Sequence, residues 1–263
     1  MTKPNIITLT TDFGVQDGFV GTMKGVMLSI NPTLALIDIC HEITRHDVHS
    51  ASYVVFNSYQ FFPKRTVHMV VVDPGVGSDR NVLIASFDDH YFVAPDNGVL
   101  KYIFHSNKEK NIYRVTNEEY FSKSISNTFH GRDVFSPLAA NLSLNKNPDR
   151  FGKITNDFVE GKIPELKFNK NNIRGCIEYV DIFGNLITNI PNNSLDNVRF
   201  QLKLGRYCIT SLHQSYSEGN ENEPVLLKGS NGKLEIAINL KSAQQVLKLC
   251  TFDMINIELI HTV

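Results

Sequence analysis

Short apolar runs alternate with helical patterns up to about Asp149, and this order constrains the fold more than any other feature of the chain. Ile6–Thr11, Leu34–Ile39 and Val67–Val72 are apolar runs of strand length. Phe19–Ile30 and Asp47–Phe61, which lie between them, carry apolar residues at helical spacing that would bury one face. Alternation of this kind is typical of βα units and a largely parallel central sheet, so we predict an N-terminal α/β domain.

Three further features complete this domain. Asp17 can cap the first helix through its side chain. Asn81–Phe87 and His90–Ala94 flank an Asp-Asp pair, which predicts a β-hairpin. Arg132–Leu144 has the pattern of another helix.

The composition changes beyond Asn145. Asn, Lys, Gly and Pro dominate Asn145–Asn172, which we interpret as a linker. After it only short strand-like runs occur, at Gly175–Val180, Leu186–Ile190, Arg206–Ser211, Leu234–Asn239 and Met254–Ile260. This spacing predicts a smaller antiparallel β-barrel or sandwich, so we place two domains at residues 1–165 and 166–263.

Charge and cysteine usage exclude several classes of protein. The net charge is -1 and no Lys/Arg run occurs, so we expect a small-molecule partner, no nucleic acid and no membrane. No apolar stretch could span a bilayer, and the N-terminal residues lack a signal-peptide pattern. Single, scattered cysteines favour a reducing cytoplasm over a zinc site or disulfide framework; they are Cys40, Cys176, Cys208 and Cys250.

The first candidate functional residue is Asp12, at the end of the first predicted strand. Open α/β sheets bind ligands at the carboxyl ends of their strands. A carboxylate at this position could accept two hydrogen bonds from a ribose diol. It could equally cap a turn or a helix.

The third long strand ends in a loop that begins with Asp73 and reaches Arg80 seven residues later. Pro74 removes a backbone donor, while Gly75 and Gly77 permit tight turns and close approach of a ligand. The Asp and the Arg can pair, which would keep the carboxylate ionised. An ordinary loop salt bridge is the alternative, and neither a dinucleotide nor a P-loop fingerprint is present.

His130 supplies the third candidate, since it lies next to Gly131 just before a predicted helix. A histidine can exchange a proton with bound water near neutral pH, although a lone histidine is more often a packed or solvated residue. A second cluster misses the HExxH spacing by one residue and is interpreted as loop and cap residues; it comprises Asp38, His41, Glu42, His46 and His49. The opening Thr10–Asp17 also lacks the adjacent aspartates of a calcium site, so no metal is predicted.

The order of motifs resembles the S-adenosylmethionine (SAM) hydrolases, also called SAM hydroxide adenosyltransferases, which are related to adenosyl fluorinases and chlorinases. The similarity covers nearly the whole chain. It rests on Thr11-Asp12-Phe13-Gly14, Lys24-Gly25, Asp38-Ile39-Cys40-His41, Val72-Asp73-Pro74-Gly75-Val76-Gly77, Ala94-Pro95-Asp96-Asn97-Gly98, Phe129-His130-Gly131-Arg132-Asp133 and Phe183-Gly184-Asn185-Leu186-Ile187-Thr188-Asn189.

The resemblance implies a homotrimer with active sites between the α/β domain of one subunit and the β domain of the next. It implies that Asp73, Arg80 and His130 position a water molecule. It also implies a set of substrate-binding residues: Asp12 at the ribose, Asn185 and Ser230-Asn231 at adenine, Asp181 at the methionine end, and Asn97 and Phe183.

The implied reaction is displacement at the ribose 5′ carbon of SAM by water, giving adenosine and L-methionine without a cofactor or metal. Arg80 would stabilise hydroxide character on the water, while Asp73 and His130 accept or relay its proton. Halogenases carry tyrosine at the position of Asp73 and serine at that of Gly131, so this chain points to water as the nucleophile.

Three other hypotheses remain open at this stage. A halogenase would form a halogenated adenosine only when halide is supplied. A metal-dependent nucleoside hydrolase would release free adenine and lose activity with a chelator. A non-catalytic adenosyl-binding protein would bind SAM or adenosine and leave it unchanged.

Overall fold

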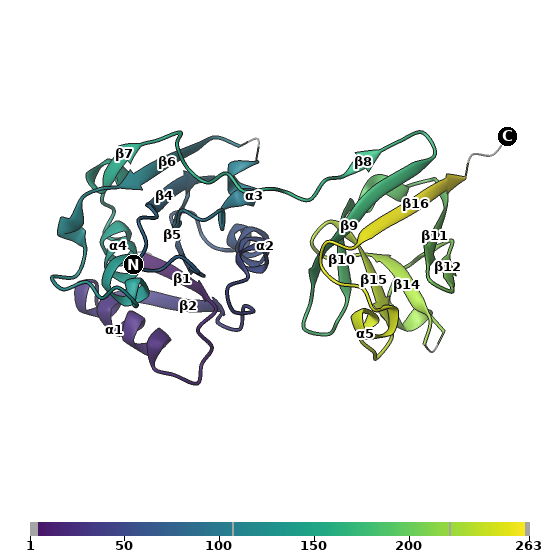
Figure 1. The fold of residues 1–263 in the computed structure, drawn as a ribbon, viewed down its shortest axis with the longest axis horizontal. Helices are drawn as coiled ribbons and strands as arrows, with labels where there is room; N and C mark the ends of the chain where they lie inside the picture. The colour runs from purple at the N-terminus through teal and green to yellow at the C-terminus, as the bar shows by residue number, and fades with distance from the viewer. Residues whose placement is uncertain (1–4, 107, 221, 261–263) are drawn as a thin grey trace. The chain divides into compact units, whose positions relative to one another are not determined.

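The computed structural model describes residues 5–106, 108–220 and 222–260. The chain forms two compact units, which divide between Ile163 and Pro164 (Figure 1). The first unit has a sheet with helices on both faces, and the second is built almost entirely from strands. The predicted α/β fold class, with a β domain following it, is confirmed.

The first unit contains a seven-stranded sheet in the order β2-β1-β3-β5-β4-β6-β7. Its strands are β1 (Asn5–Thr11), β2 (Leu34–Cys40), β3 (Val67–Val71), β4 (Val82–Phe87), β5 (His90–Pro95), β6 (Lys110–Val115) and β7 (Gly152–Ile154). Pairing is parallel from β2 to β5 and antiparallel from β5 to β7. The sheet is therefore mixed, because the β4–β5 hairpin reverses the chain direction.

The predicted hairpin turns at Asp88 and Asp89, which both have left-handed backbones, with φ of 51° and 61°. Two consecutive positive φ angles are the requirement of a type I′ turn, whose twist matches that of the flanking strands. The Asp88-Asp89 pair therefore forms the turn of the predicted hairpin.

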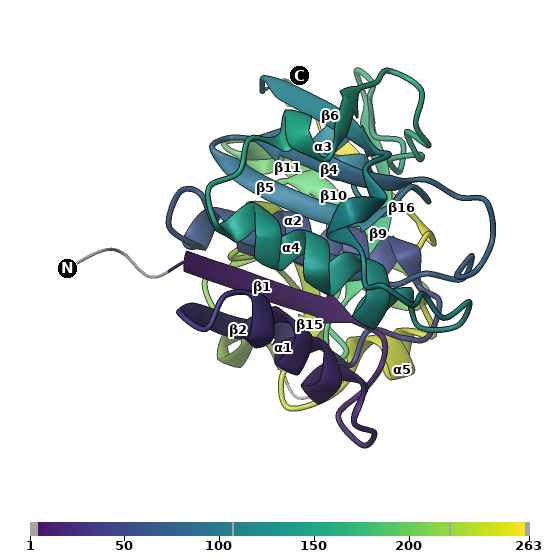
Figure 2. The ribbon, with the colours of Figure 1, turned by 90° about the vertical axis from the view of Figure 1, so that its left-hand side faces the viewer.

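Helices cover both faces of this sheet. They are α1 (Phe19–Ile30), α2 (Val48–Ser58) with the 3₁₀ turn η1 (Tyr59–Phe61), α3 (Lys101–Phe104) and α4 (Ser136–Ser143). Helices α1 and α4 lie side by side on one face (Figure 2), and α2 lies on the other (Figure 1). Strand β3 shows why: Met69 belongs to the core under α1 and α4, while Val70 belongs to the core under α2. This strand is buried on both faces, as its continuous apolar run predicted.

One local prediction was wrong, and one predicted helix differs in its first turn. Gly18, and not Asp17, occupies the N-cap of α1, and no side chain caps it. The helix predicted at Arg132–Leu144 is present as one continuous helical stretch, which begins with a π-helical turn, η3 (Gly131–Phe135), and continues as α4. Pro137 lies where the π-helical turn gives way to α4, and it has no N–H for a regular helical bond to Asp133.

The predicted linker is only partly a connection. Its first half belongs to the α/β unit, where η4 (Pro148–Arg150) leads into β7, which pairs with β6. A further 3₁₀ turn, η2 (Glu118–Tyr120), follows β6. The polar composition of the predicted linker, Asn145–Asn172, suits an edge strand as well as a connection. Composition alone could not distinguish the two.

The second unit is a nine-stranded sheet in the order β12-β11-β16-β9-β10-β15-β14-β13, with β8 added to β9. Its strands are β8 (Lys167–Phe168), β9 (Asn172–Val180), β10 (Leu186–Pro191), β11 (Arg199–Leu204), β12 (Tyr207–Ile209), β13 (Leu212–His213), β14 (Pro224–Lys228), β15 (Lys233–Ile238) and β16 (Met254–Ile260). Every pairing except β13–β14 is antiparallel. The sheet curls around one apolar core, and short helical turns connect its strands: η5 (Asn192–Leu195), η6 (Tyr216–Glu218) and α5 (Ala243–Leu247).

Within the described part of the chain, no helix is long and apolar enough to cross a bilayer. The cytoplasmic location expected from the sequence stays a prediction.

A buried pair of histidines joins three strands of the first unit. His68 Nδ1 lies 2.8 Å from Thr8 Oγ1, and His68 Nε2 lies 3.1 Å from His90 Nδ1. Both imidazoles are almost fully buried and pack against Phe92 and Tyr59. Burial, reinforced by the neighbouring His90, lowers the pKa of His68 from its ordinary value of 6.5 to about 3. His68 is therefore neutral in the folded protein near neutral pH.

We predict that acid destabilises this unit through His68. Between its unfolded and folded pKa values the unfolded chain binds a proton that the folded protein does not. The free energy of unfolding should thus fall below about pH 6.5, by up to about 1.4 kcal/mol per pH unit from His68 alone. Chemical denaturation across this range should give a shallower slope for His68→Gln than for the wild type. Equal slopes would contradict the assignment.

Candidate functional site

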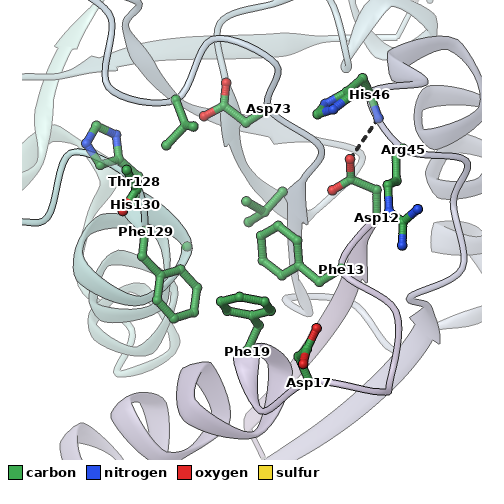
Figure 3. Close-up of a pocket in the computed structure, with 13 residues that line it drawn as sticks. Asp12, Phe13, Asp17, Phe19, Arg45, His46, Asp73, Thr128, Phe129 and His130 are labelled. Atoms are coloured by element: carbon green, nitrogen blue, oxygen red, sulfur yellow. Dashed lines mark hydrogen bonds between the residues drawn. The ribbon is translucent and has the colours of Figure 1, made fainter.

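A cavity of about 290 Å³ opens at the carboxyl ends of β1 and β3, which are neighbours in the sheet. Asp12 follows β1 and Asp73 follows β3, so the parallel pairing brings both carboxylates to the same edge. In Figure 3, Asp73 lies at the top of the cavity, His130 at the left and Asp12 at the right. The lining consists of Asp12, Phe13, Asp17, Phe19, Arg45, His46, Val71, Asp73, Val76, Thr128, Phe129, His130 and Gly131.

Arg80 contacts both Asp73 and His130, so the three candidate residues expected to position water lie together. Arg80 Nε donates to both carboxylate oxygens of Asp73, at 2.8 and 2.7 Å, and Arg80 Nη2 also pairs with Asp73 Oδ2. The same Nη2 lies 3.0 Å from His130 Nδ1. The Asp73 and Arg80 side chains are only 5% and 9% exposed, so solvent screens this ion pair weakly.

The contact with Arg80 determines which nitrogen of His130 carries the proton. A guanidinium group only donates hydrogen bonds, so Nδ1 must accept, and the proton of the neutral ring lies on Nε2. Burial, followed by the positive charge of Arg80, lowers the pKa of His130. The imidazole is therefore neutral near neutral pH and presents an N–H donor, because its ring lines the cavity.

The loop after β3 is held against the loop that carries His130. Gly77 has a left-handed backbone with φ of 79°, and a Cβ atom there would lie 2.4 Å from the carbonyl oxygen of Asn127. Only glycine allows this approach. Hydrogen bonds from Ser78 to Gly75 close the turn within the same loop.

Asp133 anchors the His130 loop from the other side. Its buried carboxylate accepts from the backbone N–H of Ser126 at 2.8 Å and pairs with Arg132. The hydrogen bond from Arg132 is the main reason that the pKa of Asp133 lies below its ordinary value. The π-helical turn keeps its shape through Ser136, whose hydroxyl donates to the Gly131 carbonyl. Turns of this kind often occur at functional sites.

The Asp12 side of the cavity combines a held carboxylate with an aromatic surface. Asp12 Oδ2 accepts from the backbone N–H of His46, which has a left-handed φ of 67°. Phe13, Phe19 and Phe129 pack together, with ring centroids 5.2 to 6.2 Å apart, and cover one wall (Figure 3). An apolar wall beside charged groups reduces their contact with water.

Sequence analysis did not select the aromatic residues of this wall. Phe19 was assigned to the buried face of its helix, yet it is 44% exposed and lines the cavity. Phe13 follows the candidate residue Asp12, and Phe129 precedes the candidate residue His130. This adjacency was the sequence signal that could have identified them as cavity residues. Thr128 carried no signal, and His46 was considered only in the cluster weighed as a metal site, because only the folded loops bring these two residues to the cavity.

Gly131 has little room for a side chain. A Cβ atom there would lie 3.1 Å from Met23 Sδ and 3.3 Å from ring carbons of Phe13 and Phe129. These distances are shorter than ordinary van der Waals contact, so a serine at this position would require its neighbours to move.

Asn97 does not line this cavity, and its side chain is engaged with the backbone. Nδ2 donates to the Val72 carbonyl at 2.9 Å, and Oδ1 accepts from the Val99 N–H at 3.1 Å. The first bond holds the residue immediately before Asp73. Its contacts suit a role in positioning that carboxylate better than direct substrate binding.

The second unit places three of the selected residues in one turn between β9 and β10. Asp181 accepts from the backbone N–H of Phe183 and of Asn185, and Asn185 Nδ2 donates to Asp181 Oδ2 at 2.9 Å. A separate cavity of about 520 Å³ adjoins the turn. It is lined by Asp181, Phe183, Asn185, Tyr216, Ile238, Asn239, Leu240, Lys241 and Ser242.

Ser230 and Asn231 are not brought to this second cavity. They lie in the turn between β14 and β15, where the Gly232 carbonyl accepts from the backbone of Asn192. Asn192 and Asn185 flank opposite ends of β10, which a strand rise of about 3.3 Å per residue separates by roughly 20 Å. The segment Asn239–Ser242, which sequence analysis missed, is the one beside Asn185.

The histidine cluster that the sequence did not favour as a metal site makes other contacts. His41 is buried between Thr11 and Asp38, and His49 Nδ1 lies 2.6 Å from Lys101 Nζ. Among the residues with described positions, no group of three or more His, Cys, Asp or Glu side chains could hold a metal ion.

Comparisons with known proteins match both units. The family model of the SAM hydroxide adenosyltransferase N-terminal domain matches residues 7–152, and that of its C-terminal domain matches residues 175–256. A protein from Methanocaldococcus jannaschii named (R)-S-adenosyl-L-methionine hydrolase is 34% identical, covering 96% of this chain and 95% of the relative. A fluorinase from an Actinoplanes species is 24% identical, covering 89% of this chain and 91% of the relative.

A solved structure also resembles the whole chain. An uncharacterized conserved protein from Thermotoga maritima superposes with a TM-score of 0.87 at 36% sequence identity. The match covers 96% of this chain and 99% of the other.

We predict that Gly77→Ala loosens both loops around the Asp73–Arg80–His130 contact. Gly205→Ala is the matched control, since Gly205 also has a left-handed backbone but nothing lies within 4 Å of an added Cβ. Gly77→Ala should lower the free energy of unfolding by about 1–3 kcal/mol more than the control does, because only its added Cβ overlaps a neighbouring atom. Hydrogen exchange should also increase at residues 73–80 and 124–130. Equal effects of the two variants would show that the close approach to Asn127 is unimportant.

Proposed function

The chain belongs to the SAM hydroxide adenosyltransferase family, and on that premise we propose that it hydrolyses SAM to adenosine and L-methionine. The observation that carries the proposal is the contact of Asp73, Arg80 and His130 beside a cavity that also presents Asp12. Relatives named as SAM hydrolases support the same reaction.

The reaction is an in-line displacement. The oxygen of water forms a bond to the ribose 5′ carbon as the bond from that carbon to sulfur breaks. The sulfonium takes the electron pair and leaves as the neutral thioether of methionine, so the leaving group needs no proton. The water loses one proton, and alignment of reactants can supply as much as roughly 7 to 11 kcal/mol of the barrier.

The geometry supports a different role for each of the three side chains. Asp73 lines the cavity, and its Oδ1 keeps a lone pair beyond the one used by Arg80 Nε, so it can accept the proton of the water. His130 is proposed as a hydrogen-bond donor through Nε2, in place of the acceptor or relay role expected from the sequence. Arg80 does not line the cavity, and we assign it to positioning the other two.

The aromatic wall suits the charge of the substrate. Phe13, Phe19 and Phe129 would surround the sulfonium with phenyl rings, whose faces attract cations. The positive charge disperses in the transition state, so a partly desolvated site favours the reaction. Asp12 would hold the ribose hydroxyls.

We further propose that the second unit binds the adenine and methionine ends of SAM. Asn185 and Phe183, with Asp181, border its cavity. We propose a homotrimer in which this cavity meets the α/β unit of a neighbouring subunit. Exposed apolar residues around the cavity, including Phe183 at 75% and Leu240 at 98%, suit such an interface.

Water is favoured over halide as the nucleophile by two positions. Asp73 is a carboxylate that is paired with Arg80. The negative charge of Asp73 would repel a halide ion in contact with it. Gly131 cannot take the serine of the halogenases unless Met23, Phe13 and Phe129 shift.

Incubation of the purified protein with SAM should give adenosine and methionine in equal amounts, measured by chromatography. Added chloride or fluoride should not yield a halogenated adenosine, and a chelator should not stop the reaction. Intact SAM after long incubation would contradict the proposal. Free adenine would point to a nucleoside hydrolase instead.

The same assay separates the proposed roles. Asp73→Asn and His130→Ala should each lower turnover by about 100-fold or more, while calorimetry still detects SAM binding. His130→Gln keeps an N–H donor at a similar reach and should retain more activity than His130→Ala. If His130→Gln is as inactive as His130→Ala, the donor role is wrong.

The shared site can be tested by mixing subunits. Asp73→Asn and Asn185→Ala trimers should each be inactive, and refolding them together in equal amounts should restore about one quarter of wild-type activity. That fraction is the chance that an intact α/β unit meets an intact β unit in a ring of independent sites. A site built within one subunit predicts no recovery.

A further inference from the structure

Asp12 and Phe13 form one wall of the cavity, which we call the Asp12 wall. A chain of polar contacts runs from the surface to the residues behind this wall. Lys24 Nζ on α1 donates to Asp38 Oδ2 on β2 at 2.6 Å, and Asp38 Oδ1 lies 3.0 Å from His41 Nε2. The other ring nitrogen of His41, Nδ1, lies 2.8 Å from Thr11 Oγ1. None of these four side chains belongs to the described cavity lining.

The negative charge of Asp38 gives this chain a direction. Asp38 meets His41 Nε2 at ion-pair distance, although without the geometry of a hydrogen bond. Its charge favours the ring tautomer with the proton on Nε2, so Nδ1 accepts from the hydroxyl of Thr11. Thr11 Oγ1 in turn accepts from the backbone N–H of Phe13 at 3.3 Å. Burial opposes ionisation of Asp38, but the contacts with Lys24 and His41 outweigh it and lower its pKa, so the carboxylate stays charged.

The inner end of the chain holds the segment that forms the cavity wall. The backbone carbonyl of His41 accepts from the N–H of Gly14 at 2.7 Å, so His41 and Thr11 together engage the amides of Phe13 and Gly14. Thr11 is 0% exposed and His41 6% exposed. Because both are buried, their contacts are stronger than they would be in water.

We propose that Thr11 and His41 are positioning residues for the reaction, which hold Asp12 and Phe13 in place through the Lys24–Asp38–His41–Thr11 chain. Neither touches the substrate, and they act through the backbone amides of the wall. The catalytic consequence rests on the proposed hydrolysis of SAM. Asp12 faces the ribose and not the attacking water, so the effect falls on substrate binding.

Thr11→Val removes the hydroxyl and keeps the shape of the side chain. We expect KM for SAM to rise about tenfold while kcat changes much less, because the wall binds substrate in the ground state and transition state alike. Thr11→Ser restores the hydroxyl and should return KM close to the wild-type value. KM does not depend on the fraction of folded protein, so lost stability does not mimic this result.

Thr10→Val is the matched control. Thr10 is the preceding residue of β1, is 1% exposed, and its hydroxyl has no hydrogen-bond partner among the residues that the structure describes. It should leave KM unchanged. An equal rise of KM in Thr10→Val and Thr11→Val would overturn the proposal, since it would reflect the loss of any buried hydroxyl.

Two further measurements separate this inference from the proposed function. Thr11→Val added to Asp12→Ala should raise KM little further, and a full additive effect would overturn action through Asp12. If the wild type does not convert SAM, the proposed function fails, and the chain is judged by amide exchange at Phe13 and Gly14. Faster exchange in Thr11→Val than in Thr10→Val supports the positioning role, and equal exchange refutes it.

Discussion

The bifurcated contact of the Arg80 guanidinium is the interaction on which the site depends. The Nε edge of the group binds the carboxylate of Asp73, and Nη2 contacts the imidazole of His130. This arrangement keeps Asp73 an acceptor and makes His130 a donor, so the two groups that face the cavity have opposite hydrogen-bonding roles. A water molecule, which both donates and accepts, matches such a pair.

Close backbone packing allows this contact to form between loops far apart in the sequence. Gly77 meets Asn127 at a distance that excludes any side chain, and Asp133 ties down the loop before His130. The Thr11–His41 contact holds the Asp12 wall in place in a similar way. The polar groups of the cavity therefore depend on buried or closely packed residues behind them, as preorganised sites require.

The two candidate carboxylates that the structure brings to one cavity share a simple property. Asp12 and Asp73 each follow a parallel strand, and neighbouring parallel strands end at the same edge. Asn97 and Ser230-Asn231 came from similarity of motifs alone. In the structure Asn97 bonds to backbone groups, and Ser230-Asn231 lies at the far end of β10 from Asn185. A motif records which residues recur, and it does not say which partner each side chain has.

The sequence by itself determined the class of fold, most strand positions and a set of candidate side chains for the chemistry, because periodicity and residue type are local properties. Only the tertiary structure decided that β4, β6 and β7 make the sheet mixed, that a predicted helix begins with a π-helical turn, and that Phe19 faces a cavity. It also decided the proton position on His130. Each of these depends on what a residue meets across the fold, and sequence spacing carries no information on such distant contacts.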